Sequence, residues 1–560
     1  MIEDALADLL RSALASSGLD LDGEPPEIVL TKPKQKEHGD FATNLALQVA
    51  SRVGKPSREV AEVIVANLPP SDVVESKEIA GPGFINFRVR DDWLHRALGD
   101  AVAQGSGYGR SAPNGKRVQV EFVSANPTGP LHVGQARNAA LGDALARLLE
   151  FTGWDVTREY YFNDAGGQMD RFGASVVARY LQAVGREAAV PEDGYHGEYV
   201  ADIAQDILRA EGPGLADLPP DERLAKLRDE AVKRVLTQVR STLDRFGVRF
   251  DVYTSERTLS ERGEIETAVE RLREAGLAYE ADGAVWFRST EFGDDKDRVL
   301  IRSNGEHTYF AADCAYVIDK FSRGFDHVVY VWGADHHGDV ARVRGAAEAL
   351  GYDPSALEFV IYQWVSFLRD GVPLPMSKRA GTFVTLDELI DEVGTGAARY
   401  HLLMFSPDAT MNFDIEAVRR QSLDNPVYYV QYGHARIASI LRKAAERDVE
   451  LRPIDQADLS RLSQEAELDL LRAIAGVTRE IRTAAERRAP HRLTHSAQEL
   501  AARFHRFYTD CPVLSDDGAL TQARLWLCVG TKQVIANLLD LLGVSAPESM
   551  ERSEDAERAG

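Results

Sequence analysis

The chain has 560 residues, of which 44% are hydrophobic and 27% charged, so it is long enough for three or four domains with separate apolar cores. Its formal net charge of −23 argues against indiscriminate binding to DNA or another polyanion, because such affinity comes from neutralising phosphates. Three widely spaced cysteines suit neither a disulfide framework nor a zinc site, and no apolar run is long enough to cross a membrane, which favours a cytoplasmic protein.

The first predicted unit covers residues 1–110 and mixes helices with strands. An acidic amphipathic helix opens the chain, and residues 40–53, "DFATNLALQVASRV", space their apolar positions as a helix does. The segment "GFINFRV", residues 83–89, alternates like a strand. Residues 104–117 are dense in Gly, Pro, Ser and Asn, which marks a domain boundary. We therefore expect a small α+β domain before a separate core.

Residues 111–370 are predicted to form a core around a parallel sheet. The segment "RVQVEFV", residues 117–123, alternates like a strand, and a helix is expected from about Val133 to Thr152. A second strand follows in "DVTREYYFN", residues 155–163. A strand, a helix and a strand in this order make a βαβ unit of the Rossmann kind.

A largely charged, helical stretch at about residues 171–295 is expected to be an insertion between two halves of the sheet. The second half is predicted to resume with "RVLIRSNG", residues 298–305, and "HVVYVWGADHH", residues 327–337.

The remainder of the chain divides into three parts. Residues 371–415 read as a connector of loop and helix, and residues 416–547 as an almost wholly helical domain. Residues 548–560 are too polar to pack and are predicted to be disordered.

The turn "HVGQ" before the core helix has the features of a phosphate site. A helix N-terminus offers free N–H groups and a partial positive charge. His132 and Gln135 add side-chain donors, and Gly134 allows a phosphate to approach the backbone closely. The pattern is neither a dinucleotide fingerprint nor a Walker loop. On these residues alone, a histidine that merely caps the helix is the better explanation.

A second signal follows in "PMSKRAGTFVTL", residues 375–386. Lys378 and Arg379 lie on a predicted mobile loop, and a cationic loop that closes over phosphates stabilises charge during phosphoryl or nucleotidyl transfer. An isolated Lys–Arg pair is usually a solvated loop charge. Its combination with the "HVGQ" turn on a Rossmann half is much more specific.

"HVGQ" and "PMSKR" resemble the HIGH and KMSKS signatures of class I aminoacyl-tRNA synthetases. More narrowly, "VEFVSANPTGPLHVGQARNAALGD", "YFAADCAYVIDKF", "WGADHHGD" and "FHRFYTDCPVL" resemble arginyl-tRNA synthetases, and the likeness covers nearly the whole chain. The resemblance implies ATP-dependent activation of L-arginine to arginyl-adenylate, followed by transfer to the 2′-hydroxyl of the terminal adenosine of an arginine-accepting tRNA.

The resemblance also implies an α/β Rossmann-type parallel-sheet core, an N-terminal α+β domain that touches the tRNA elbow, and a C-terminal all-α bundle that binds the anticodon. It implies a monomer that uses ATP with Mg²⁺ as substrate and has no tightly bound cofactor. Members of the family generally activate arginine only when tRNA is bound, so we expect little ATP–pyrophosphate exchange without tRNA.

Site residues are carried over only where this sequence matches the motifs. His132 and Lys378 correspond to catalytic positions of the two signatures. The implied ATP-binding residues are His132, Gly134, Gln135, His337, Met376, Ser377, Lys378 and Arg379. The implied arginine-binding residues are Glu121, Asn126, Tyr309, Asp313 and His336.

Within the arginine set, Tyr309 and Asp313 share one helix face if their segment is helical, and they match the family's guanidinium-binding pair. His336 and His337 are adjacent and could not easily ligate one ion from a strand end, so no metal site is predicted.

The tRNA contacts are inferred more loosely. Phe84 and Asn86 lie where the family's N-terminal domain touches the tRNA elbow. Tyr429 is the predicted contact in the helical tail, whose basic stretch suits bases stacked on rings. We expect most of the tail's aromatic side chains to be core residues, and the set considered is Tyr428, Tyr429, Phe504, Phe507 and Tyr508.

Two other functions remain open from sequence. A tRNA-independent ligase or nucleotidyltransferase could share the fold, although the N-terminal domain and the helical tail argue against it. A degenerate paralogue could act only as an RNA-binding or regulatory module. Gln135 and Pro375, which depart from the signatures, favour that possibility, whereas the retained His132, Gly134 and Lys378 argue against it.

Lys378 is left as the main loop cation, because Pro375 stands where the signature has its first lysine. We predict that Lys378→Ala lowers kcat for arginine activation by about 10²-fold or more, since charge neutralisation supplies much of the rate. ATP–pyrophosphate exchange in the presence of tRNA measures this step. A change below about twofold would assign the role to another residue.

Overall fold

A computed structural model describes residues 2–21, 23–31, 33, 35–374, 376–377 and 382–550. The chain divides into two compact units. The first comprises Met1–Tyr108, Arg436–Thr478 and Glu499–Val534, and the second comprises Gly109–Ala435, Arg479–Gln498 and Ile535–Gly560.

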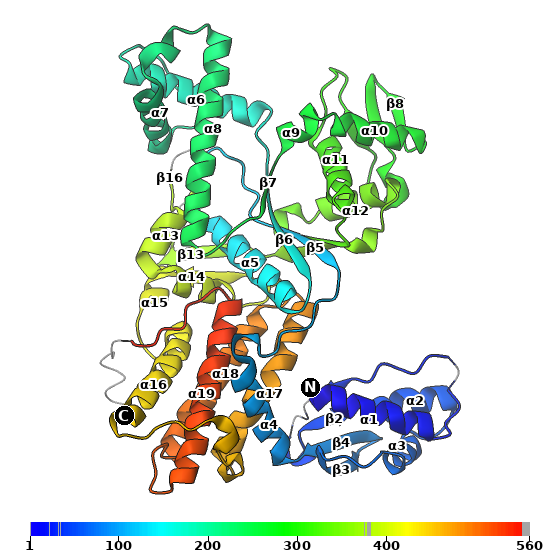
Figure 1. Ribbon diagram of the computed structural model, residues 1–560. Coiled ribbons are helices and arrows are strands. Elements are labelled where there is room, and N and C mark those ends of the chain that lie inside the picture. Colours follow the sequence, from blue (N-terminus) through cyan, green and yellow to red (C-terminus); the bar gives the residue numbers. More distant parts are fainter. Residues whose placement is uncertain are drawn as a thin grey trace. The chain divides into compact units, whose positions relative to one another are not determined.

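The N-terminal part of the first unit is an α+β domain, as predicted (Figure 1). Its antiparallel sheet has the order β1-β2-β4-β3. The strands are β1 (Leu30–Thr31), β2 (Phe41–Thr43), β3 (Val74–Ala80) and β4 (Phe84–Val89). The helices are α1 (Ile2–Ser16), α2 (Leu45–Val53) and α3 (Ser57–Ala66), and α4 (Asp91–Gln104) follows.

One helix was expected over residues 40–53, and this is wrong for its first residues. Phe41, Ala42 and Thr43 are all buried in β2, where Phe41 pairs with Phe87 of β4. The helix begins only at Leu45, whose backbone N–H donates to Thr43 Oγ1. Three buried residues are too few to show a strand's alternation, so the helical spacing beyond them dominated the pattern.

A five-stranded sheet in the second unit has the order β12-β11-β5-β6-β7, and every neighbouring pair is parallel. Its strands are β5 (Arg117–Glu121), β6 (Asp155–Phe162), β7 (Val252–Ser255), β11 (His327–Gly333) and β12 (Leu357–Tyr362). The helix α5 (Ala136–Phe151) connects β5 to β6, which confirms the predicted βαβ unit. The strand order reverses between β5 and β11, where ligands bind in sheets of this type.

Two predictions about the inserted region are wrong. The strand β7 lies within residues 171–295, so that range does not interrupt the sheet as one insertion. Residues 298–305 do not resume the parallel sheet, because β10 (Arg298–Ile301) pairs antiparallel with β9 (Ala284–Phe287) in a separate sheet completed by β8 (Ala278–Ala281). A four-residue strand carries no pattern that identifies its partner.

The α-helices between residues 167 and 349 form two groups (Figure 1). The first group comprises α6 (Gly167–Ala183), α7 (Glu198–Glu211) and α8 (Pro220–Arg245). The second comprises α9 (Glu256–Glu261), α10 (Glu264–Glu274), α11 (Tyr309–Ser322) and α12 (Asp339–Ala349).

The connector combines short strands with helices. Its strands are β13 (Val365–Arg369), β14 (Val372–Pro373), β15 (Met376–Ser377), β16 (Thr382–Phe383) and β17 (Met411–Asp414). Its helices are α13 (Leu386–Val393), α14 (Thr395–Leu402) and α15 (Ile415–Arg419).

Four long helices confirm the predicted helical C-terminal region. They are α16 (Pro426–Glu446), α17 (Glu465–Glu486), α18 (His491–Asp510) and α19 (Gly518–Leu541). Residues 551–560, most of the tail predicted to be disordered, lie outside the described residues. Within the described ranges, every helix is too short or too polar to cross a bilayer.

The helix α5 is buried on almost all sides and carries buried polar residues as well as apolar ones. Its Asp143 forms an ion pair with Arg399 of α14, and both side chains are buried. Gly142 packs directly against Phe122, the residue after β5: a Cβ at this glycine would lie 2.2 Å from Cγ of the ring. This close contact fixes α5 against the end of the strand.

We predict that Gly142→Ala lowers the free energy of unfolding by about 1–3 kcal/mol, because the added methyl group overpacks this contact. Urea or thermal unfolding would measure the loss. Gly99→Ala in α4 is the matched control: no atom lies within 4 Å of its added Cβ, so it should instead stabilise by about 0.5–1 kcal/mol. A Gly142→Ala protein as stable as the parent would show that Phe122 moves aside without cost.

Candidate active site at the carboxyl edge of the sheet

The carboxyl ends of β5, β6, β7 and β11 meet at one edge, and polar residues follow each strand there. Glu121 ends β5, Asn163 follows β6 and Glu256 follows β7. The short helix η6 (Ala334–His336) follows β11. Because this edge flanks the point where strand order reverses, it is the expected ligand site of the sheet.

The backbone after β5 is strained. Val123 and Ser124 have φ angles of 64° and 43°, in the left-handed region that non-glycine residues rarely adopt. Asn138 of α5 holds this turn, because its Oδ1 accepts from Val123 N at 2.6 Å and its Nδ2 donates to Val331 O at 3.0 Å. One buried amide thus links the ends of β5 and β11, and strain of this kind is typical of functional sites.

The "HVGQ" turn forms a capping box at η3 (Val133–Gln135), directly before α5. His132 Nδ1 accepts from Gly134 N at 2.9 Å, and Gln135 Oε1 accepts from His132 N at 3.0 Å. His132 therefore does cap the helix, as the simpler interpretation held. A neutral imidazole whose Nδ1 accepts carries its proton on Nε2, which can then donate.

The segment just after the second signature lies against the first signature. After the β15–β16 hairpin, in which Met376 is opposite Phe383, the chain runs alongside the "HVGQ" turn. An isolated antiparallel β-bridge pairs His132 with Thr385. In this bridge, Val133 N donates to Val384 O at 3.0 Å, and Leu386 N donates to Leu131 O at 2.8 Å.

Several residues of the second signature are not among those that the structure describes. Pro375, Lys378 and Arg379 lie outside the described residues, as do the side chains of Met376 and Ser377, so their predicted ATP contacts stay predictions.

Asp313 lies in a cluster of carboxylates. It is one turn after Tyr309 on α11, which confirms that the two share a helix face. Removal from water raises the pKa of Asp313 to about 7, and the negative charges of Glu256, Asp339 and Glu121 add to the effect. Tyr309 is 60% exposed. A half-buried cluster of acids beside an exposed ring suits a cation such as guanidinium.

Beneath this cluster, Glu121 and Lys320 form a buried ion pair. The Lys320 ammonium also lies 3.7 Å from the ring centroid of Tyr330 and 4.1 Å from that of Tyr316. Burial lowers the pKa of Lys320, and the charges of Glu121 and Glu159 oppose this shift. Ser124 Oγ donates to the second oxygen of Glu121 at 3.1 Å. Glu121 is therefore held rigidly.

The other predicted arginine-side residues border the same edge. Asn126 Nδ2 donates to Gln168 Oε1 at 2.8 Å, and its Oδ1 accepts from Asn163 N at 3.2 Å. His336 Nδ1 lies 3.2 Å from an oxygen of Asp339, and this hydrogen bond raises the pKa of His336. His337 is exposed beside it.

Sequence reasoning missed several residues of this edge, notably Asn138, Tyr161, Glu256 and Lys320. Tyr161 Oη donates to Glu256 Oε2 at 2.7 Å, which fixes one carboxylate of the cluster. Glu256 was detectable, because it follows the short strand "VYTS" at a strand's carboxyl end. Lys320 and Asn138 carry no such signal, since their roles depend on contacts from other elements.

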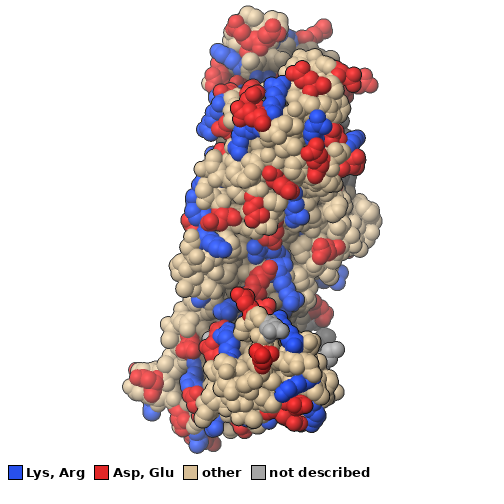
Figure 2. Space-filling model, turned by 90° about the vertical axis from the view of Figure 1, so that its right-hand side faces the viewer, with Lys and Arg blue, Asp and Glu red and all other residues tan. Residues whose placement is uncertain are grey.

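The predicted tRNA residues differ in accessibility. Phe84 is exposed on β4, whereas Asn86 is buried, so only Phe84 is available at the surface. Tyr428, Phe504 and Phe507 are buried, as expected for core aromatics, and Tyr429 is half-buried. Acidic and basic side chains are interspersed over the face drawn in Figure 2. RNA binding on this face would therefore depend on particular residues.

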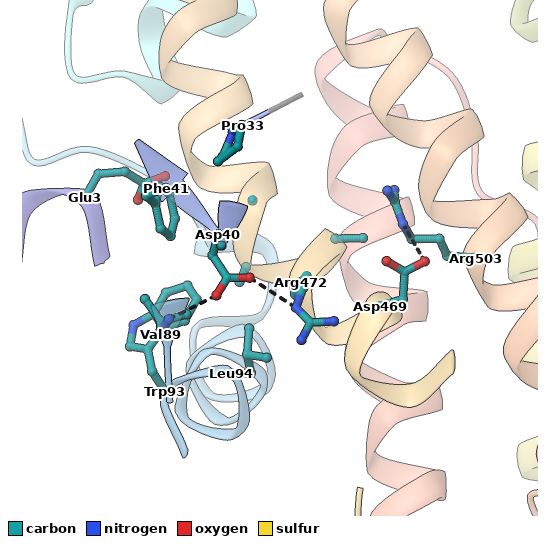
Figure 3. Close-up of a pocket in the computed structure, with 14 residues that line it drawn as sticks. Glu3, Pro33, Asp40, Phe41, Val89, Trp93, Leu94, Asp469, Arg472 and Arg503 are labelled. Carbon is teal, nitrogen blue, oxygen red and sulfur yellow. Dashed lines mark hydrogen bonds and ion pairs between the residues drawn. The ribbon is translucent and has the colours of Figure 1, made fainter. Parts of the chain in front are cut away.

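A separate pocket lies in the first unit and contains none of the predicted catalytic residues (Figure 3). Its volume is about 150 Å³, and apolar residues such as Phe41, Trp93 and Leu94 line it. Asp40 accepts from Val89 N at 2.9 Å and pairs with Arg472 at 3.3 Å. These charges already have partners, so we assign the pocket no catalytic role.

Three protein-family models match the chain. "Arginyl tRNA synthetase N terminal domain" covers residues 2–89, "tRNA synthetases class I (R), catalytic domain" covers 97–205 and 216–412, and "DALR anticodon binding domain" covers 430–550.

Curated relatives and a solved structure agree with these matches. The arginine–tRNA ligase of Moorella thermoacetica is 50% identical over 98% of both chains. That of Desulforamulus reducens is 47% identical over 98% of this chain and 99% of its own. The Thermus thermophilus arginyl-tRNA synthetase structure has a TM-score of 0.78 at 25% identity, covering 98% of this chain and 100% of that chain.

The buried pair beneath the acidic cluster gives a stability prediction. Lys320→Met leaves the Glu121 carboxylate buried without its cation, which should cost about 3–5 kcal/mol. Adding Glu121→Gln removes the unpaired charge and should recover most of that loss. Denaturant unfolding of the single and double variants measures the difference, and equal stability of the two would show that the ion pair does not couple these residues.

Proposed function

The chain belongs to the class I arginyl-tRNA synthetases and charges tRNA with arginine, and we propose that the chemistry takes place at the carboxyl edge of β5, β6, β7 and β11. The observation that carries this proposal is the group of carboxylates around Asp313 beside the exposed Tyr309 ring, where burial and nearby negative charges raise the pKa of Asp313 and a bound cation would be stabilised. Arginine supplies that cation. The tRNA-independent ligase and the non-catalytic paralogue are set aside, because the relatives are arginine–tRNA ligases over nearly their whole length.

ATP would bind with its phosphates at the N-terminal end of η3 and α5. His132 would donate from Nε2, and Gly134 would allow close approach to the backbone. Lys378 and Arg379 would close over the same phosphates, which the pairing of Leu131–Val133 with Val384–Leu386 supports. Gln135 would act mainly by fixing His132, since its Oε1 already accepts from that backbone.

Arginine would place its guanidinium between Tyr309 and Asp313. Its α-amino end would lie towards Glu121 and Asn126, which are held by Lys320, Ser124 and Gln168. The arginine carboxylate is already ionised near neutral pH and attacks the α-phosphorus of ATP, so pyrophosphate leaves and arginyl-adenylate forms. No general base is required, and positioning with charge neutralisation supplies the rate.

In the second step, the terminal 2′-hydroxyl of tRNA attacks the arginyl carbonyl carbon, and AMP leaves. His336, at the end of η6, would lie near the arginine, and His337, which follows it, near the ATP. Family membership supports a requirement for bound tRNA before arginine is activated, and a monomeric enzyme in the cytoplasm.

Magnesium would enter with ATP. In the part of the chain that the structure describes, no three His, Cys, Asp or Glu side chains are grouped so that they could hold a metal ion. The phosphate oxygens would therefore provide its main ligands.

Asp313 gives this proposal a pH dependence. Because a proton on its carboxyl competes with the guanidinium, and its pKa is about 7 in the empty pocket, kcat/KM for arginine should fall as the pH drops from 8 to 6. The slope should approach about tenfold per pH unit below the pKa and flatten above it. Aminoacylation at several pH values, with saturating ATP and tRNA, measures this profile.

Asp313→Asn should raise the arginine KM by about 10–100-fold and flatten the profile, because a neutral amide cannot pair with guanidinium. Tyr309→Phe is the matched control, since it keeps the carboxylate and should keep the pH dependence. His336, whose pKa Asp339 raises, is retained in Asp313→Asn, so the comparison with that variant isolates the carboxyl group. An unchanged arginine KM in Asp313→Asn would remove this residue from the pocket.

A further inference from the structure

Two large aromatic side chains stand exposed on neighbouring loops of the second unit. Trp364 is 62% exposed, in the two-residue link between β12 and β13. Phe405 is 49% exposed, in the loop between α14 and β17. Single exposed apolar residues are common, but two exposed aromatic rings on loops that are joined to each other indicate an interaction surface.

The loops that carry these rings are fixed to each other by Arg137 of α5. Its buried guanidinium donates to Gln363 O at 2.6 Å and to Ser406 O and Ala409 O, each at 2.9 Å. In addition, Gln363 N donates to Pro407 O at 2.9 Å. The backbone beside each ring is therefore held in a set position, so stacking on the rings would cost little ordering of the protein.

These loops continue the edge that holds the proposed active site. Tyr362, the last residue of β12, has its hydroxyl 3.4 Å from Asn138 Nδ2, and a Cβ placed on Gly333 would lie 3.6 Å from that hydroxyl. Gly333 immediately precedes η6, and Asn138 holds the turn after β5. Trp364 therefore lies two residues beyond a side chain that touches the site.

The charge of the two loops indicates what could bind. Residues 362–365 and 403–410 contain no lysine or arginine, and Asp408 adds a negative charge. A surface of this kind cannot attract phosphate groups, but it can stack on the faces of bases, because stacking on aromatic rings tolerates any base. Unpaired nucleotides fit this surface better than the triphosphate of ATP does.

We propose that Trp364 and Phe405 form a stacking platform for the unpaired nucleotides at the 3′ end of tRNA. The terminal ribose must reach the arginyl group at the carboxyl edge of the sheet, so the nucleotides before it must cross the adjacent surface. The platform lies on that surface, and Arg137 is the positioning residue that fixes its two loops to α5. The inference rests on the site location proposed above.

Equilibrium binding of two RNAs to the full-length protein tests the platform: tRNA with its complete 3′ end, and the same tRNA with the unpaired 3′ nucleotides removed. Trp364→Ala should weaken binding of the complete tRNA by about tenfold, which lies within the range of one stacked base. It should leave binding of the shortened tRNA within about twofold of the parent protein. Trp364→Phe retains a ring and should recover most of the affinity.

Phe405→Ala provides a second, independent variant and should show the same selective loss as Trp364→Ala. Thermal unfolding of each variant checks that the fold is retained.

Three results would overturn the proposal. Equal weakening of the complete and the shortened tRNA would place the contact elsewhere on the RNA. Unchanged binding of both would leave the rings without this role. A raised KM for ATP with unchanged tRNA binding would assign Trp364 to the adenine of ATP. Arginine kinetics of Asp313→Asn test the site location separately, so failure of one proposal can be told from failure of the other.

Discussion

The pairing of Leu131–Val133 with Val384–Leu386 is the contact on which the proposed site depends. Each segment is weak evidence when taken alone: one is a capped turn, and the other follows a short hairpin. Two backbone hydrogen bonds, which together form one antiparallel bridge, join them and bring the segment after the second signature to the N-terminus of α5. The helix N-terminus supplies a partial positive charge there, and in the proposed site Lys378 and Arg379 would add theirs.

On the arginine side of the proposed site, at the carboxyl edge of the parallel sheet, buried ion pairs lie beneath a group of carboxylates. Lys320 and Arg323 neutralise Glu121 and Glu159 within the core, where an unpaired charge would be costly. Nearer the surface, Asp339 pairs with Arg342 and His336, whereas a partner of Glu256 is the neutral hydroxyl of Tyr161. Burial, with the nearby carboxylates, raises the pKa of Asp313. In the proposed site, a cationic substrate would balance the charges of Asp313 and Glu256. A carboxylate cluster of this kind favours a cationic side chain over a neutral one, in agreement with the proposed arginine site.

Much of this arrangement could be predicted from the sequence, since strands and turns next to functional motifs have local patterns. The βαβ unit, the helical tail and the shared face of Tyr309 and Asp313 depend on spacing along the chain. The antiparallel partner of β10 and the place of β7 in the sheet do not, because pairing depends on contacts between separate segments. Asn138 and Lys320 were missed for the same reason: each acts across elements, and their neighbours in sequence give no indication of it.

The left-handed turn at Val123 and Ser124 has a consequence for how the enzyme can evolve. Glycine or asparagine would adopt these backbone angles more readily than valine, so either would relieve local strain. Because such a residue adopts the same angles, Val123 N would still donate to Asn138, and the strand ends that present Glu121 and η6 would stay linked. The turn is therefore a place where a substitution can raise stability and leave the geometry of the proposed site intact.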